Sequence, residues 1–263
     1  MPTAQDIVDY VFEIAPNPAG RVENVYQHGD GSDAVSGVGV AWWLTADILE
    51  DMGRAKQNLG LTHETVFFPT PRGFSWGPAP DSEDAIPANR RVRDVLKRHG
   101  ITVHRFHSNI DSAEWGIPRM LLKKLGWDRY PTEWLQDVPV VELPPRSLAA
   151  LVEEVRTKLE LPFVRWDGDP DRSVSRVGLP FGGMCQGWGG AMCPAGAGID
   201  ALIGGDVIDG IVGLARTEGW AVIDAMHHAT EMPGLEALAA RIGLRFPAIP
   251  VRFYPNASPW RAS

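Results

Sequence analysis

Two six-residue segments of the chain share one alternation of β-branched with small or polar positions. Val35 to Val40 reads VSGVGV, and Val174 to Leu179 reads VSRVGL. A period of two with many β-branched side chains is typical of a β-strand. The pattern therefore predicts one strand in each half of the chain, with the same register of hydrophobic positions.

The segments that follow these two strands also correspond. In the first half, a helix-like stretch from Thr45 to Asn58 has Thr45 as its N-cap, and a short strand, Leu59–Leu61, then opens onto Thr62-His63-Glu64. In the second half, a glycine-rich segment precedes a strand at Ile199–Ile203, which is followed directly by Gly204-Gly205-Asp206. Each half is therefore expected to place polar residues directly after its second strand.

A further helix and strand complete each half. In the first half the helix begins near Pro87, which suits a first helical turn, and Gly100 ends it. In the second half a helix over Val207–Glu218 is ended by Gly219. An apolar strand follows each glycine, and each strand runs into a motif of the form H-x-x-x-(D/E).

This repetition of element order predicts an internal duplication. Alternating strands and helices indicate the α/β class, with two similar lobes, each a sheet flanked by helices. We place the N-terminal lobe at residues 1–137 and the C-terminal lobe at residues 138–263. The C-terminal segment is a candidate to pack back on the first lobe.

Composition excludes several classes of function. The 263-residue chain has a formal net charge of -8 and no basic cluster, which argues against nucleic acid as a partner. The N-terminus lacks the basic residues of a secretory signal, and no apolar run approaches the ~20 residues that span a bilayer. We therefore expect no membrane partner and a cytoplasmic location. The two cysteines, Cys185 and Cys193, are expected to be reduced and structural.

The candidate chemistry lies at the ends of the predicted strands, where α/β sheets gather their ligands. Imidazole and carboxylate groups together suit borderline or hard divalent metals, and so many carboxylates favour two metals over one. The alternative interpretation of each motif alone is a capping or surface pair. His228 is left out of the set. The predicted ligands are His63, Glu64, His107, Asp111, His227 and Glu231.

The same residues resemble the motifs of a known family, the NGG-one-interacting-factor-three-like proteins. This family is also named dinuclear metal centre protein, hexameric type, or GTP cyclohydrolase 1 type 2 homolog. Asp224 to Glu231 reads DAMHHATE and resembles a signature of roughly D-x-G-H-(Y/H)-A-T-E. His107 to Asp111 reads HSNID and resembles H-T-N-L-D, and His63-Glu64-Thr65 is similar to an H-H-P or H-E-P signature.

The resemblance implies metal-ligand roles for His63, Glu64, Asp111, His227 and Glu231, with His107 as a less certain neighbour. It also implies two divalent ions (Zn, Fe, Mn, Co or Ni), two α/β lobes and a homohexamer. The chain departs from the family pattern twice. Glu64 replaces the second histidine, and Met226 replaces a glycine, so a positive φ before His227 would be strained.

We interpret the protein as a metal-dependent hydrolase with a dinuclear centre, acting on a small molecule such as a cyclic amide, ester or nucleotide through a metal-bound hydroxide. Glu64 is the candidate general base. No P-loop or GxGxxG motif supports GTP as the substrate. The alternative is a non-catalytic metal-binding, metal-delivery or scaffold protein.

Two further segments leave their roles open. The loop from Phe67 to Pro87 follows two candidate ligands, so Phe74, Trp76 and Arg72 could line a substrate pocket or fill a subunit interface. Redox regulation through the two cysteines would require that their thiols lie close together.

Overall fold

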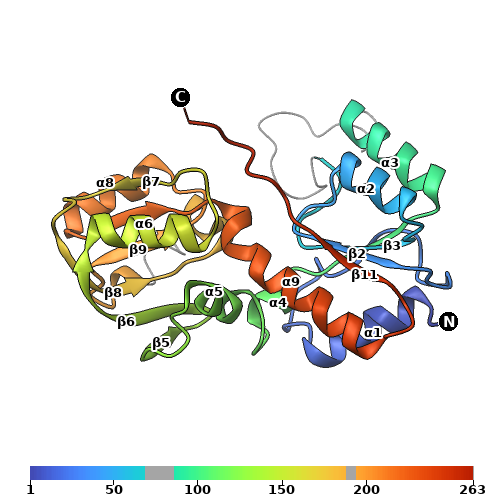
Figure 1. Cartoon of the computed structure of the whole chain (residues 1–263), viewed down its shortest axis with the longest axis horizontal. Helices are drawn as coiled ribbons and strands as arrows, with labels where there is room; N and C mark the ends of the chain where they lie inside the picture. The colour runs from blue at the N-terminus through green and yellow to red at the C-terminus, as the bar shows by residue number, and fades with distance from the viewer. Residues whose placement is uncertain (69–85, 188–193, 263) are drawn as a thin grey trace. The chain divides into compact units, whose positions relative to one another are not determined.

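The computed structural model describes residues 1–68, 86–187 and 194–262. It divides into two compact units, each with its own β-sheet (Figure 1). Unit 1 comprises residues 1–113 and 235–256, and unit 2 comprises residues 114–234 and 257–263. The predicted class is confirmed, because both units combine a sheet with flanking helices.

Unit 1 contains a five-stranded sheet in the order β1-β4-β3-β2-β11. The strands β2, β3, β4 and β11 are parallel, and β1 is antiparallel at the edge beside β4. Figure 1 shows α2 and α3 on one face of this sheet. The elements of unit 1 are α1 (Ala4–Ile14), β1 (Tyr26–His28), β2 (Val38–Ala41), α2 (Ala46–Arg54), β3 (Leu59–Thr62), α3 (Pro87–His99), β4 (Thr102–Arg105), α4 (Ser108–Ser112), β11 (Val251–Tyr254) and the 235–245 part of α9 (His227–Arg245).

Local signals in the sequence account for the helix ends in unit 1. The Thr45 hydroxyl accepts a hydrogen bond from the Ile48 amide at 3.4 Å and caps α2. Proline occupies the first turn of α3, and Gly100 ends that helix in the left-handed conformation with φ of 60°. The N-terminal helix α1, which the pattern did not single out, begins with a capping box between Thr3 and Asp6.

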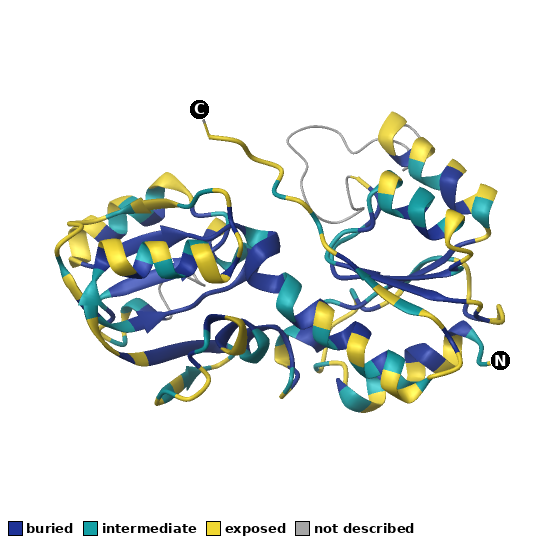
Figure 2. Ribbon diagram, viewed as in Figure 1, coloured by how far each residue is buried: buried dark blue, intermediate teal, exposed yellow. Residues whose placement is uncertain are grey.

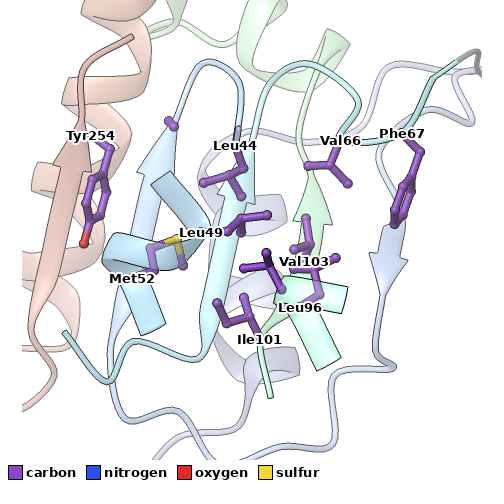
Figure 3. Packing of buried hydrophobic residues seen from close by; sticks show 11 residues of the cluster. Leu44, Leu49, Met52, Val66, Phe67, Leu96, Ile101, Val103 and Tyr254 are labelled. Carbon is purple, nitrogen blue, oxygen red and sulfur yellow. The ribbon is translucent and has the colours of Figure 1, made fainter. Parts of the chain in front are cut away.

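One hydrophobic cluster of unit 1 lies between the sheet and the helices α2 and α3. Leu49 and Met52 from α2 pack with Leu96 from α3 and Val103 from β4 (Figure 3). Burying each such side chain contributes about 1.5–3 kcal/mol to the free energy of unfolding. This packing fixes the central strands, and with them the residues that follow each strand.

Unit 2 contains a six-stranded sheet in the order β5-β6-β8-β9-β10-β7. The strands β8, β9 and β10 are parallel, and β7 is antiparallel at the edge beside β10. Figure 2 shows the central strands of this sheet as buried, with exposed positions on the outer sides of its helices. The elements of unit 2 are α5 (Ile117–Leu125), β5 (Thr132–Leu135), β6 (Val138–Ser147), α6 (Leu148–Lys158), β7 (Arg165–Asp167), β8 (Ser173–Gly178), the 3-10 helix η2 (Gly182–Gln186), β9 (Ala201–Gly204), α8 (Asp209–Glu218), β10 (Ala221–Asp224) and the 227–234 part of α9.

The two sheets repeat one topology. In unit 1, β2, β3 and β4 are neighbours in sequence order with β1 antiparallel beyond β4, and in unit 2, β8, β9, β10 and β7 have the same arrangement. The register agrees as well, because Leu59 pairs with Thr102 as Ala201 pairs with Ala221. This correspondence is what an internal duplication predicts.

The two units do not follow a single cut in the sequence. The N-terminal lobe was predicted to span residues 1–137. Strand β5, residues 132–135, pairs antiparallel with β6 and is therefore part of the second sheet. At the other end, β11 pairs parallel with β2 from Val251↔Val38 to Tyr254↔Ala41. The chain thus returns to the first sheet after it has formed the second.

Within the described residues, the helices are all too short or too polar to cross a lipid bilayer.

His104 predicts a pH dependence of the stability of unit 1. Its ring packs edge-on against Phe12 and Tyr26, and burial lowers the pKa of His104 to about 4. In the unfolded chain His104 takes up a proton near pH 6.5, whereas in the folded protein it does so only near pH 4. The free energy of unfolding is therefore unaffected by protonation of His104 above pH 6.5 and falls as the pH falls from 6.5 towards 4. We expect the free energy of unfolding to fall by up to about 3 kcal/mol over this range.

Urea unfolding of the wild type and of His104→Phe at pH 7.5 and pH 4.5 measures this loss. The phenylalanine variant keeps an aromatic ring but cannot take up a proton, so its stability should change less with pH. An equal pH dependence in the two proteins would contradict the assignment to His104.

Candidate metal-binding site

The predicted ligands of unit 1 follow two adjacent parallel strands. His63 and Glu64 come directly after β3, and His107 comes two residues after β4. The two strands pair in register, with Thr62 opposite Arg105, so their carboxyl ends meet at one edge of the sheet. This edge is where an α/β sheet presents its ligand-binding residues.

The His63 side chain is buried and held in one tautomer. Its Nδ1 lies 3.0 Å from the carbonyl oxygen of Phe106. Because a carbonyl oxygen can only accept, Nδ1 carries the proton and donates it, which leaves a lone pair on Nε2. A histidine that donates from one ring nitrogen to a backbone carbonyl and offers the other is arranged as metal-ligating histidines are.

His107 and Asp111 complete the group around His63. The two imidazole rings stack with their centroids 4.5 Å apart and an interplanar angle of 19°. The Asp111 carboxylate spans both rings, with Oδ1 at 3.6 Å from His63 Nε2 and Oδ2 at 3.6 Å from His107 Nδ1. His107 precedes the short helix α4 that contains Asp111, which explains the four-residue spacing of the motif.

The distances between the ligand atoms of His63, His107 and Asp111 fit coordination of a shared cation better than direct hydrogen bonds. One ligand atom from each of His63, His107 and Asp111 lies within 4.8 Å of the other two. A nitrogen–oxygen distance of 3.6 Å is too long for a hydrogen bond, whereas two metal bonds of about 2.0–2.2 Å at a tetrahedral or wider angle span nearly this distance. The donor set of unit 1 therefore fits a divalent metal ion.

Two charged residues of this site escaped the sequence analysis. Arg105 donates from Nε to the His63 carbonyl oxygen at 2.8 Å and places Nη2 3.5 Å from Glu64 Oε2. Glu23 Oε1 lies 3.9 Å from His107 Nδ1. Burial acts to raise the pKa of Glu23, but backbone hydrogen bonds, Ser108 and the nearby His107 charge outweigh it and lower the pKa. Neither residue belongs to a repeated motif, so no pattern in the sequence pointed to it.

In unit 2, His227 is the first residue of α9 and has a carboxylate on each side of its ring. Nδ1 lies 2.8 Å from Asp206 Oδ2, and Nε2 lies 3.1 Å from Glu231 Oε2. Glu231 is one helical turn further along α9. Gln186 donates from Nε2 to the same Asp206 oxygen. Burial acts to raise the pKa of Asp206, but the hydrogen bond and charge of His227, aided by Gln186, lower it overall.

The backbone lies very close to the side chains of His227 and Glu231. The Thr230 hydroxyl donates to the His227 carbonyl oxygen at 2.8 Å and accepts from the Gly182 amide at 2.8 Å. A Cβ on Gly182 would lie 1.8 Å from Glu231 Oε1, and one on Gly205 would lie 2.5 Å from His227 Cα. Both glycines are therefore required for the close approach of the chain to the two side chains.

Met226 adopts the conformation that its family counterpart, a glycine, would accept freely. Its φ is 66°, in the left-handed region. The Met226 amide donates to Asp224 Oδ1 at 3.0 Å, which helps to hold this turn before α9. A non-glycine residue there costs on the order of 1–2 kcal/mol, so the strain foreseen from the sequence is present.

Other residues singled out in the sequence do not join either group or lie outside the description. His228 is buried, and burial together with the charge of His227 lowers its pKa. Cys185 is a buried free thiol whose pKa is raised to about 12 by burial and by Asp224 and Asp206, which makes it unreactive near neutral pH. Arg72, Phe74, Trp76 and Cys193 lie outside the described residues.

Together, these features define an α/β protein of two topologically equivalent units. Unit 1 has an imidazole–carboxylate group that could hold a metal ion, and unit 2 has His227 paired with two carboxylates. Residues 3–259 match the model of the Duf34/NIF3 (NGG1p interacting factor 3) family. The chain belongs to this family.

Relatives and solved structures agree with this assignment. The chain is 23% identical over 223 residues to a protein of Clostridium acetobutylicum named GTP cyclohydrolase 1 type 2 homolog, covering 81% of this chain and 79% of the relative. A protein of Allochromatium vinosum with the same name is 30% identical over 161 residues, covering 60% and 61% of the two chains. The solved structure of ybgI, a protein of unknown function, superposes with a TM-score of 0.81 at 23% identity, covering 98% of this chain and 100% of that one. The last likeness establishes the fold.

Proposed function

We propose that the protein is a metal-dependent hydrolase that binds two divalent ions through the six ligands His63, Glu64, His107, Asp111, His227 and Glu231. The observation that carries the proposal is the group of His63, His107 and Asp111, whose ligand atoms lie within 4.8 Å of one another. The arrangement of His227 between two carboxylates supports a matching role for unit 2. Nitrogen and oxygen donors without thiolate suit Zn, Fe, Mn, Co or Ni.

Each residue has a defined task in this proposal. Bound divalent ions would supply Lewis acidity and would make a nearby water more acidic. His63 offers Nε2 because Phe106 fixes its tautomer, and Asp111 offers one oxygen toward each imidazole. The Arg105 guanidinium forms an ion pair with Glu64, with Nη2 3.5 Å from Oε2, beside the ligand His63. The small-molecule substrate class is a prediction from the sequence, and the homohexamer is what the family resemblance implies.

Metal analysis of the purified protein tests the ligand sets. We expect two ions per chain in the wild type and a lower content in His227→Ala and in Glu231→Ala, since each variant removes a donor from the pair in unit 2. His99→Ala and Glu218→Ala are the matched controls, because His99 contacts Glu50 and Glu218 is exposed at the end of α8. If both His227→Ala and Glu231→Ala still bound two ions per chain, the proposal would be wrong.

Activity separates the hydrolase from the alternative of a metal-binding or metal-delivery protein. The metal-loaded protein is screened against esters, cyclic amides and nucleotides. A hydrolase should turn over one class, and Glu64→Gln should lower that rate while the protein remains folded. Metal binding without turnover, together with ready release of the metal to a chelator, would favour delivery.

A further inference from the structure

Asp206 occupies the same place in the second sheet as Glu64 does in the first. Thr62 pairs with Arg105 at the end of β3, and Gly204 pairs with Asp224 at the end of β9. Glu64 and Asp206 are each the second residue after the paired position. The duplication has therefore kept a carboxylate at this point of both units.

The two carboxylates have different partners. Glu64 lies near the Arg105 guanidinium, whereas the equivalent of Arg105 is Asp224, which offers no positive charge. Asp206 contacts the His227 ring instead, at 2.8 Å from Nδ1. Its own backbone is in the left-handed region with φ of 51°, and the absence of a side chain on Gly205 allows α9 to begin beside it.

This contact decides which nitrogen of His227 is available. An ionised carboxylate can only accept, so His227 donates from Nδ1, and a neutral ring then has its lone pair on Nε2. Nε2 lies 3.1 Å from Glu231 Oε2, which is also an acceptor. Two acceptors at this distance repel each other unless a cation, either a proton or a metal ion, lies between them.

We propose that Asp206 is a positioning residue for metal binding in unit 2, which holds His227 through Nδ1 so that Nε2 and Glu231 face a divalent cation together. Carboxylates that accept from the second nitrogen of a ligating histidine fix its ring and increase its donor strength. Gln186 donates to the same Asp206 oxygen and fixes the carboxylate in turn. This inference rests on the proposed metal-binding function and adds a residue that neither sequence motif contains.

The test measures binding of Zn²⁺ and Co²⁺ to the full chain for the wild type, Asp206→Asn and Asp209→Asn. Asp209 is an exposed carboxylate of the same unit, so its variant is the control for the lost charge. We expect Asp206→Asn to weaken binding by about 10–100-fold and to shift the Co²⁺ ligand-field bands. The urea unfolding midpoints of the metal-free Asp206→Asn and Asp209→Asn proteins should agree.

Each alternative outcome has a distinct meaning. Equal affinities and spectra for the two variants would overturn the role of Asp206 while leaving the proposed metal site standing. A fall in affinity that is matched by a fall in the unfolding midpoint would show a structural role and would also overturn it. A wild-type protein that binds no Zn²⁺ or Co²⁺ would overturn both the positioning role and the proposed function.

Discussion

Asp111→Asn is expected to weaken binding of a divalent metal ion to unit 1 by about 100-fold or more, beyond the 10–100-fold typical of an outer-shell change. The Asp111 carboxylate lies 3.6 Å from a nitrogen of both His63 and His107, so it is the acceptor shared by the whole group. Asparagine has the same shape but no charge. The variant therefore isolates the contribution of the anionic oxygens.

Calorimetric titration with Zn²⁺ and Mn²⁺ measures this effect. Asp94→Asn removes an exposed carboxylate from α3 in the same unit and serves as the matched control. If the two variants bound metal with affinities within about threefold, a difference of under 1 kcal/mol, Asp111 would not be a ligand.

Gly182→Ala should destabilise the protein by about 2–5 kcal/mol, because steric overlap and backbone strain act together. The added Cβ would lie 1.8 Å from Glu231 Oε1 and 3.3 Å from His227 Nε2. Gly182 also has a φ of 58°, which alanine adopts only with strain. Relief of the overlap requires that η2 or Glu231 move, so metal binding by unit 2 should also weaken.

Gly187→Ala is the control for this prediction. Gly187 lies in the same segment, but its φ is -134° and a Cβ there would meet no atom of the described residues within 4 Å. Urea unfolding of the two variants should therefore differ by several kcal/mol. A Gly182→Ala protein as stable as Gly187→Ala would show that the approach of η2 to Glu231 is looser than the structure has it.

Much of the fold could be predicted because its signals are local. Capping residues such as Thr45, and glycines that end helices, such as Gly100 and Gly219, act within a few residues and have the predicted roles in the structure. The order of strands and helices then followed from the hydrophobic period. Helix α1 has equally local signals in its capping box, and it was missed because no repeated motif drew attention to it.

The candidate site was predictable in part for the same reason. His63 and His107 follow two neighbouring parallel strands, whose carboxyl ends meet at one edge of the first sheet, and His227 follows β10 of the second sheet. Asp206 could also have been predicted as a site residue, because the internal repeat aligns Gly204-Gly205-Asp206 with the segment after β3. It was not selected because no histidine stands beside it in the sequence, whereas His63 directly precedes Glu64.

The α/β class, the repeated order of elements and the histidines at the strand ends could all be predicted, since each depends on residues close together in the chain. Three contacts became visible only in the folded protein: β11 pairs with β2, Arg105 lies beside Glu64, and Asp206 contacts the His227 ring. These contacts depend on strand register and on which side chains a tightly packed backbone admits. Neither property is encoded in local periodicity, because each depends on segments that are far apart in the chain and meet only after folding.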